Sequence, residues 1–319
     1  MFMNVSRQIN VIPNDLAGLR LDQALAHLFP QHSRSRLKEW LLKDLIIVQG
    51  GPKRPKDIVS GGETVEIKSQ TKEAIKAQAQ PLMLDIAYED EELIVLNKPA
   101  GLVVHPGAGN PDKTLMNGLL FKYPKLREVP RAGIIHRLDK DTSGLIIIAK
   151  NLISHTALLR TFEQRKISRH YIAVCKGVLT GGGIINLPIS RHPVDRKKMS
   201  VQDNGREAIT HFTVKERFAS FTFINVKLET GRTHQIRVHF AHRRNALVGD
   251  QTYGGRLTTP RGASEELIQI LRHFKRQALH AERLIFNHPF TDKIIDIKVL
   301  PPKDFIDLVE AMRRDLINE

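Results

Sequence analysis

The sequence predicts an α+β protein with a small N-terminal unit and a larger part built on a mixed, largely antiparallel sheet. Strand-like apolar runs recur from residue 82 onward, with helical patterns between some of them. Residues 69–81, rich in Lys, Gln and Ala, carry almost no large apolar side chain and are typical of a linker. We therefore divide the chain into an N-terminal extension (1–17), a small unit (18–68), this linker and a large domain (82–319).

The small unit is expected to hold two short helices followed by two strands. In LRLDQALAHLF the leucines fall on one helical stripe, and SRSRLKEWLL begins at a serine that suits an N-cap. LIIVQGG and ETVEI have the composition of strands, and a turn-rich segment separates them. The unit is therefore α+β in its own right.

The large domain is expected to be rich in strands. The runs that suit strands are LDIAYED, LIVLNKPAGLVV, GLIIIAK, HYIAVCKGVL, AITHFTVKERF, FTFINVKLET and IIDIKVL. Helices are expected on SHTALLRTFEQRK and LIQILRHF. This order predicts a mixed or antiparallel sheet with helices packed on it.

The charge balance favours a polyanionic partner. The chain carries 49 Lys and Arg against 34 Asp and Glu, a formal net charge of +15. Nucleic acid is the first candidate for such a surplus. A basic protein without such a partner is the alternative that charge alone leaves open.

Cysteine content and hydropathy indicate a cytoplasmic protein. Cys175 is the single cysteine, which excludes a disulfide within the chain and a zinc site built from several cysteines. No apolar run approaches the roughly 20 residues that cross a bilayer. We expect a soluble protein that has no contact with a membrane.

Cofactor motifs are not found in the sequence. HPGAGNPD has Gly107 and Gly109 but Asp112 where a dinucleotide fingerprint needs a third glycine, and no P-loop occurs. The histidines near residue 240 are accompanied by neither HExxH nor cysteine ligands. We therefore expect no nucleotide cofactor and no metal.

One polar stretch lies between two apolar runs. In GIIHRLDKDTSGLIIIAK, residues 133–150, six charged or hydroxyl side chains separate Ile134-Ile135 from Leu145 and its neighbours. Burial of an unpaired charge costs several kcal/mol, so such residues occur where they are paired, solvated in a cleft, or used. This stretch is the first candidate for chemistry.

Four segments in fixed order carry a family resemblance. They are NKPAGLVVHPG around Lys98, HRLDKDTSG at 136–144, RKISRHYIAV around Tyr171 and LETGRTHQIRVHFA at 228–241. Together they resemble the RluA-type pseudouridine synthases over nearly the whole chain. The resemblance implies the pseudouridine synthase fold and isomerisation of uridine in RNA without a cofactor. VVHPGAGNPD, VPRAGIIHRLDKDTSG and RQALHA favour the branch that acts on large-subunit (23S) ribosomal RNA.

The resemblance also implies the catalytic residues. The Asp of HRLDxxTSG, here Asp139, is catalytic in the family, and Arg237 is its ion-pair partner. Tyr171 is the candidate for stacking on a uracil that has left the RNA helix. A purely structural Asp139–Arg237 pair is the alternative. RRNALVGDQTYGG departs from the family at Asn245, Ala246 and Gln251, where no catalytic group falls.

Other residues of these motifs are expected to bind RNA. Arg137 either fills the space that the uridine leaves or contacts phosphate, and His136 serves beside it or orients the loop. The remaining candidates for substrate and RNA binding in the large domain are Lys98, Arg232 and His234.

The reaction explains the need for a carboxylate. The bond from ribose C1′ to uracil N1 breaks, the base rotates, and C1′ joins C5. A carboxylate attacks C1′ or removes the C2′ proton, and the sequence does not decide between these routes. A glycosidase is the rival interpretation, but most glycosidases use two carboxylates that flank the bond, and Asp141 is the only obvious neighbour of Asp139.

The small unit resembles the S4 RNA-binding domain in the order of its features. This resemblance implies that Arg34, Arg36 and Lys38, on or beside the second helix, bind phosphates. An ordinary solvated helix face is the alternative. The hairpin departs from the family at Gln49-Gly50, where Asn-Gly is common.

The sequence therefore predicts a monomeric enzyme that converts specific uridines of large-subunit ribosomal RNA, free or in pre-ribosomal particles, to pseudouridine. The same reaction on transfer RNA or at another ribosomal site is one alternative. A non-catalytic RNA-binding factor for ribosome assembly is the other. Neither the number nor the identity of the modified uridines follows from the sequence.

Overall fold

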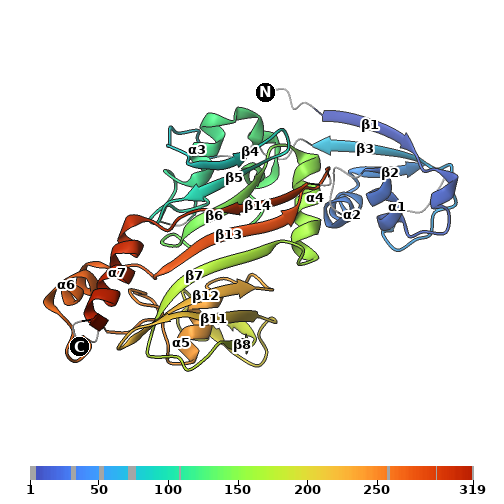
Figure 1. The fold of residues 1–319 in the computed structure, drawn as a ribbon. Coiled ribbons are helices and arrows are strands. Elements are labelled where there is room, and N and C mark those ends of the chain that lie inside the picture. The colour runs from blue at the N-terminus through green and yellow to red at the C-terminus, as the bar shows by residue number, and fades with distance from the viewer. Residues whose placement is uncertain are drawn as a thin grey trace.

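The computed structural model describes residues 5–29, 34–49, 54–70, 77–107, 109–256, 259–291 and 293–317. The described residues form a small unit at one end of a long, strongly twisted sheet (Figure 1).

The small unit is a three-stranded antiparallel sheet covered by two helices. Its elements are β1 (Val5–Val11), α1 (Leu21–Leu28), α2 (Arg34–Leu42), β2 (Ile46–Gln49) and β3 (Thr64–Gln70). The order of the strands is β1-β3-β2. Alternate residues of β2 are buried, and Ile46 and Val48 pack against leucines of both helices. The two helices and two strands expected from the sequence are present.

Residues 5–11, expected to belong to an N-terminal extension, form a strand of this sheet. β1 pairs with β3 along its whole length, from Val5 opposite Gln70 to Val11 opposite Thr64. The separation of residues 1–17 as an extension is therefore wrong, because β1 supplies the hydrogen bonds of one edge of β3. β3 also runs two residues into the segment expected to be a linker.

The rest of that segment is described only in part. Residues 71–76 lie outside the described residues. The end of the segment is attached to the large domain, because the Gln80 backbone N–H donates to the carbonyl of Asn117 and the Asn117 side chain donates to the carbonyl of Gln78.

The large domain contains the following elements: β4 (Ile86–Glu89), β5 (Leu93–Lys98), α3 (Leu115–Lys122), β6 (Ser143–Ala149), α4 (Leu152–Glu163), β7 (Ser168–Lys176), β8 (Gly183–Asn186), β9 (Ile189–Arg191), β10 (Met199–Val201), β11 (Ile209–Arg217), β12 (Phe221–Leu228), α5 (Gln235–His242), α6 (Glu265–His273), β13 (Leu279–Asn287), β14 (Ile294–Lys298) and α7 (Lys303–Ile317). Every run expected to be a strand contains one.

In the described residues, nine strands form one mixed sheet in the order β4-β5-β6-β13-β7-β12-β11-β8, with β14 also paired to β13. β13 and β6 are parallel, and the other pairs are antiparallel. The predicted α+β class with a mixed, largely antiparallel sheet is confirmed.

β6 explains the apolar run that follows the polar stretch. All seven of its residues are buried, because protein covers both faces of the strand. Ile146 and Ile148 join the core around Tyr171, whereas Leu145 and Ile147 pack with Leu158 of α4. The polar residues before β6 are thereby fixed at the centre of the sheet.

None of the helices within the described ranges is both long enough and apolar enough to cross a membrane.

The close pairing of strands at Gly144 gives the first prediction. Gly144 has φ +112°, and a Cβ there would lie 2.3 Å from the carbonyl oxygen of Ala281 in β13. We expect Gly144→Ala to lower the free energy of unfolding of the large domain by at least about 2 kcal/mol. The new methyl group would overlap with the backbone of Ala281, and an alanine would be strained at this φ. Urea unfolding followed by circular dichroism measures the loss.

Gly101 provides the matched control. Its φ is +85°, but a Cβ there would meet no atom within 4 Å. Gly101→Ala should therefore lower the free energy of unfolding by only about 1 kcal/mol, the cost of a left-handed backbone at an alanine. Equal losses in the two variants would contradict the close approach at Gly144.

Candidate active site

A cavity of about 240 Å³ lies where the loop before β6 meets β7 and the start of α5. Of the site residues expected in the large domain, the structure brings together seven around it: Asp139, Arg237, Tyr171, His136, Arg137, Arg232 and His234. A second cavity, of about 450 Å³, extends toward His105 and Asn110 and shares Asp139, Arg137, His234 and Arg237 with the first. Asp139 therefore lies at the junction of two cavities.

The carboxylate of Asp139 is held by a turn and by an arginine. Its backbone carbonyl accepts the N–H of Thr142 at 3.1 Å, which closes the turn that leads into β6. Its Oδ2 accepts a hydrogen bond of 2.9 Å from Nη1 of Arg237. The side chain is 15% exposed, so a substrate in the cavity can reach it.

Arg237 is in turn held by a second carboxylate, Asp250. Nε and Nη2 of Arg237 donate to the two oxygens of Asp250 at 2.7 and 2.9 Å. The Asp250 side chain is fully buried and also accepts the backbone N–H groups of Thr252 and Tyr253. The guanidinium carbon of Arg237 lies 5.0 Å from the centre of the Tyr253 ring. Asp139, Arg237 and Asp250 thus form one chain of ion pairs.

This chain fixes the charges at its buried end. Burial favours neutral Asp250, but the hydrogen bonds and the charge of Arg237, together with the backbone N–H groups of Tyr253 and Thr252, outweigh burial and lower the pKa of Asp250. For Arg237, burial is likewise the largest single effect, but the hydrogen bonds and charges of Asp250 and Asp139 together outweigh it and raise the pKa. Sequence reasoning missed Asp250, since VGDQTYGG was noted only for its departure from the family.

His234 closes the other side of Asp139. Its backbone is left-handed, with φ 56°, at the N-cap of α5. Nδ1 lies 2.8 Å from the hydroxyl of Tyr253, and Nε2 lies 3.7 Å from Oδ1 of Asp139. Burial lowers the pKa of His234 and outweighs the attraction of Asp139. At neutral pH the ring is therefore neutral and is a polar neighbour of Asp139.

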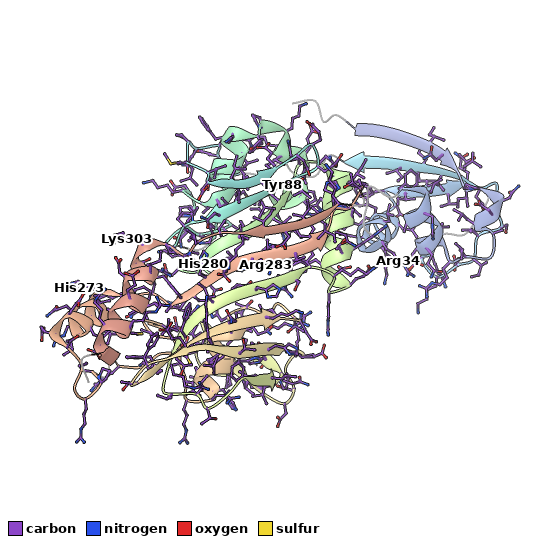
Figure 2. All side chains as sticks on the ribbon, viewed as in Figure 1. Arg34, Tyr88, His273, His280, Arg283 and Lys303 are labelled. Carbon is purple, nitrogen blue, oxygen red and sulfur yellow. The ribbon has the colours of Figure 1, made fainter. Side chains whose placement is uncertain are left out.

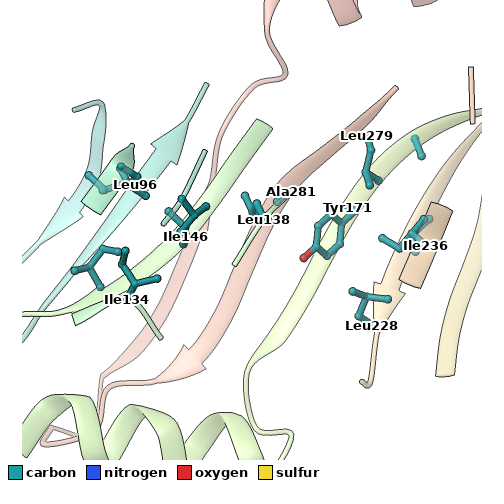
Figure 3. Packing of buried hydrophobic residues seen from close by; sticks show 14 of the residues in the cluster. Leu96, Ile134, Leu138, Ile146, Tyr171, Leu228, Ile236, Leu279 and Ala281 are labelled. Atoms are coloured by element: carbon teal, nitrogen blue, oxygen red, sulfur yellow. The ribbon is translucent and has the colours of Figure 1, made fainter. Parts of the chain in front are cut away.

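Tyr171 forms the apolar side of the cavity. It comes from β7, is 7% exposed, and packs in the core with Leu138, Leu228, Ile236 and Leu279 (Figure 3). Among the described residues its hydroxyl makes no hydrogen bond. Burial raises the pKa of Tyr171, so the phenol is protonated at neutral pH. The ring offers a flat apolar surface beside Asp139.

The remaining expected residues differ in exposure. Arg137 is exposed at the rim of both cavities and has no partner among the described residues. Nε2 of His136 accepts the N–H of Ile147 at 3.1 Å, and burial lowers its pKa to about 3, so the ring is neutral. Arg232 is half-buried, and its Nε donates to the carbonyl of Glu207. Only Arg137 is free to move onto a ligand.

Comparison with known proteins identifies the family. The sequence profile of the RNA pseudouridylate synthase family matches residues 92–242. The chain is 51% identical over 316 residues to ribosomal large subunit pseudouridine synthase D of Salmonella typhimurium. This alignment covers 99% of this chain and 97% of the relative. Identity to the same protein of Haemophilus ducreyi is 50%, over 95% and 94% of the two chains. The chain belongs to the RNA pseudouridylate synthase family.

Solved structures agree on the fold of this synthase. Human RNA pseudouridylate synthase domain containing 1 superposes with a TM-score of 0.54, over 70% of this chain and 86% of that one. Human RNA pseudouridylate synthase domain containing 4 superposes with a TM-score of 0.56, over 72% and 93%. Both are 24% identical to this chain, so they show the fold alone. The family and the enzyme class, an isomerase, predicted from the motifs are confirmed.

Lys98 of this synthase is not open to RNA, contrary to expectation. The side chain is 1% exposed, and Nζ donates to the carbonyls of Pro99, Leu102 and Lys140 at 2.8, 3.0 and 2.9 Å. Burial lowers its pKa to about 7, against the attraction of Asp141 and Asp139. Because all three donors are used inside the protein, Lys98 joins the loop after β5 to the loop that carries Asp139.

The residues expected on α2 lie in the small unit and not at the cavity. Arg34 donates to the buried carboxylate of Asp22, which also pairs with Arg20. Lys38 is exposed and unpaired among the described residues. The side chain of Arg36 lies outside what the structure describes. In the described residues no three His, Cys, Asp or Glu side chains gather as metal ligands.

The role of Asp250 gives the second prediction. In Asp250→Asn the amide can accept from only one of the two Arg237 donors that Asp250 now holds, so Arg237 should shift away from Asp139. We expect the rate of pseudouridine formation at saturating RNA to fall about 100-fold, the scale of a misplacement of about 1 Å. Affinity for RNA should stay within a few-fold. Single-turnover kinetics and a binding titration separate the two effects.

Asp304 is the matched control. It also binds an arginine through both oxygens, with Arg276 Nε and Nη2 at 2.7 and 2.9 Å. Arg276 forms no hydrogen bond with the Asp139 side chain and meets its loop only through a long hydrogen bond, 3.4 Å, to the carbonyl of Asp141. Asp304→Asn should leave the rate nearly unchanged. A normal rate in Asp250→Asn, or the same loss in both variants, would show that Asp250 does not position Arg237.

Proposed function

We propose that this chain converts specific uridines of large-subunit (23S) ribosomal RNA to pseudouridine, with Asp139 as the catalytic residue. The placement of Asp139 carries the proposal: it is bound to Arg237 and faces a cavity that has an aromatic ring on one wall. The relatives named for the large ribosomal subunit match this chain over nearly its full length, which supports this RNA as the substrate.

The target uridine would leave its helix to enter the cavity, as bases do when enzymes act on them. The ring of Tyr171 offers a stacking surface that replaces part of the lost base stacking. With the base there, the ribose faces Asp139 at the junction of the two cavities. Arg137, exposed at the rim, fills the gap in the RNA or binds phosphate.

The hydrogen bond from Arg237 holds the carboxylate of Asp139 toward the sugar. In one route, the carboxylate attacks C1′ while the electron pair of the C1′–N1 bond leaves with the base. In the other, it removes the C2′ proton as that bond breaks. Both routes end when C5 bonds to C1′, which releases the Asp139 oxygen in the first route and is accompanied by return of the proton from Asp139 to C2′ in the second. C5 then loses its proton and N1 gains one. The overall change is an isomerisation, for which we propose no cofactor.

The small unit would act as an S4-like clamp. Lys38 on α2 is exposed, and the guanidinium groups of Arg20 and Arg34 share the single carboxylate of Asp22, which leaves a net positive charge. Such groups add affinity through phosphates without touching the target base. We propose that the synthase acts as a monomer in the cytoplasm.

Mapping of pseudouridines tests the function and gives the third prediction. In cells that lack this gene, large-subunit RNA should lose pseudouridine at one or a few positions, and the wild-type gene should restore them. Asp139→Asn should not restore them although the purified variant binds RNA within a few-fold of wild type, because it removes the reactive charge and little contact area.

Other outcomes would redirect the proposal. Unchanged ribosomal RNA with losses in transfer RNA would move the enzyme to a transfer RNA substrate. Restoration by Asp139→Asn would remove Asp139 from the catalytic role.

The clamp gives the fourth prediction. Lys38→Gln should weaken binding to large-subunit RNA and make the dependence of log affinity on log salt shallower by about one counterion. Pseudouridine formation at saturating RNA should not change. Lys303→Gln, at the opposite end of the molecule from Arg34 and α2 (Figure 2), is the control and should leave the slope unchanged. Equal slopes for wild type and Lys38→Gln would contradict a phosphate contact at Lys38.

A further inference from the structure

The cavity contains a buried arginine that has no acidic partner. Arg169, two residues before Tyr171 on β7, therefore lies on the same face of the strand and also lines the cavity. It is 5% exposed. Its Nη2 donates to the carbonyl of Glu229 at 3.2 Å, and no carboxylate lies within 4 Å among the described residues. A charge in such a place is costly unless something else compensates it.

The donors of Arg169 are largely unused. Nε is buried and has no hydrogen-bond partner in the structure. The flat face of the guanidinium lies on the ring of Phe162, with its carbon 4.6 Å from the ring centre. Burial lowers the pKa of Arg169, and the nearby Arg232 acts in the same direction. The protein therefore holds an unneutralised cation beside the space where a base would lie.

Gly231 leaves the room that this guanidinium occupies. A Cβ on Gly231 would lie 2.5 Å from Nη1 of Arg169. The backbone of Gly231 is not left-handed, so the absence of a side chain matters here for space and not for conformation. The position of the guanidinium depends on this gap.

The burial of Arg169 indicates which part of the RNA it meets. The phosphates of a bound RNA stay near the surface, where Arg137 and the half-buried Arg232 lie. A guanidinium that is 5% exposed and lies beside Tyr171 is in reach of a base that has entered the cavity. In the apolar wall formed by Ile135, Leu228 and Leu279, the carbonyl oxygens of uracil would otherwise lose their hydrogen bonds.

We propose that Arg169 donates hydrogen bonds to a carbonyl oxygen of the flipped uracil and stabilises the negative charge that the base acquires when the C1′–N1 bond breaks. In that step the electron pair of the bond leaves with N1, and the charge spreads over N1 and the carbonyl oxygens. C1′ gains the Asp139 oxygen, or C1′ and C2′ gain a double bond as Asp139 takes the C2′ proton. The charge disappears when C5 attacks C1′, a step that releases the Asp139 oxygen from C1′ or, in the other route, returns the proton from Asp139 to C2′. A cation fixed before the reaction stabilises such charge effectively in a site that excludes water.

This inference rests on the proposed role of Asp139 and is tested on the RNA that wild-type protein modifies. Single-turnover consumption of the target nucleoside is measured by digestion and chromatography, once with uridine RNA and once with the same RNA transcribed with 5-fluorouridine. Fluorine at C5 makes the base a better leaving group, so its departure needs less help. RNA affinity is measured in parallel.

Arg169→Met should lower the rate on uridine RNA about 100-fold, the scale for loss of one preorganised donor. The loss on 5-fluorouridine RNA should be several-fold smaller, and RNA affinity should stay within a few-fold. Gly231→Ala, which pushes the guanidinium aside without removing it, should give the same pattern and carries the test if Arg169→Met does not fold. Arg283→Met is the control, since Arg283 lies on the opposite face of the neighbouring strand in an ion pair with Asp296, and it should behave as wild type.

An equal loss of rate on both RNAs would show that Arg169 does not stabilise the departing base. Weaker binding at an unchanged rate would place Arg169 on a phosphate. A rate unchanged in both Arg169→Met and Gly231→Ala would also overturn the inference. If the wild-type protein modified an RNA other than that of the large subunit, the proposed function would be wrong. The role of Arg169 would still be decided, because the variants would be compared on the RNA that the wild-type protein does modify.

Discussion

The site depends on one arginine held between two carboxylates. Asp250, fully buried, binds two donors of Arg237 and leaves the third nitrogen, Nη1, directed at Asp139. A buried ion pair gains little net stability after desolvation, so its value here is geometric. Asp250 neutralises the charge of Arg237 on its buried side. Arg237 can therefore orient Asp139 without adding its own positive charge to the cavity. The remaining positive charge of the cavity comes from Arg137, Arg169 and Arg232, which suits RNA and a base that becomes negative.

The sheet supplies the rigidity that this arrangement needs. Asp139 lies in the loop that enters β6, a strand buried on both faces, and Arg237 lies on α5 after β12. Lys98, at the end of β5, holds this loop in place by donating a hydrogen bond to the carbonyl of Lys140. Tyr171 comes from β7, which lies next to β13. The catalytic and stacking groups thus come from separate segments, but each segment is anchored in the same core, so their distances are set before RNA binds.

The sequence predicted the features that depend on local pattern and missed those that depend on distant contacts. Strands with continuous apolar runs, such as β6 and β12, were found, and the specific motifs located Asp139, Arg237 and Tyr171. β13 was missed because Glu282 and Arg283 interrupt its apolar run, next to the bulge between His280 and Arg283. α5 was missed because nearly all of its residues are buried, so it has no amphipathic stripe. Asp250, Arg169 and the true environment of Lys98 follow from contacts between segments far apart in the chain, and no short pattern encodes them.

The account is tested most directly by the structure of the Asp139→Asn variant bound to the RNA that the wild-type enzyme modifies. It predicts that the target nucleotide is rotated out of its helix, with the base against Tyr171, its carbonyl edge toward Arg169, and ribose C1′ next to residue 139. Arg237 should still be bound to Asp250. A target uridine that remains stacked in the RNA, or a base seated beside His105 while the space next to Tyr171 holds no part of the RNA, would contradict it.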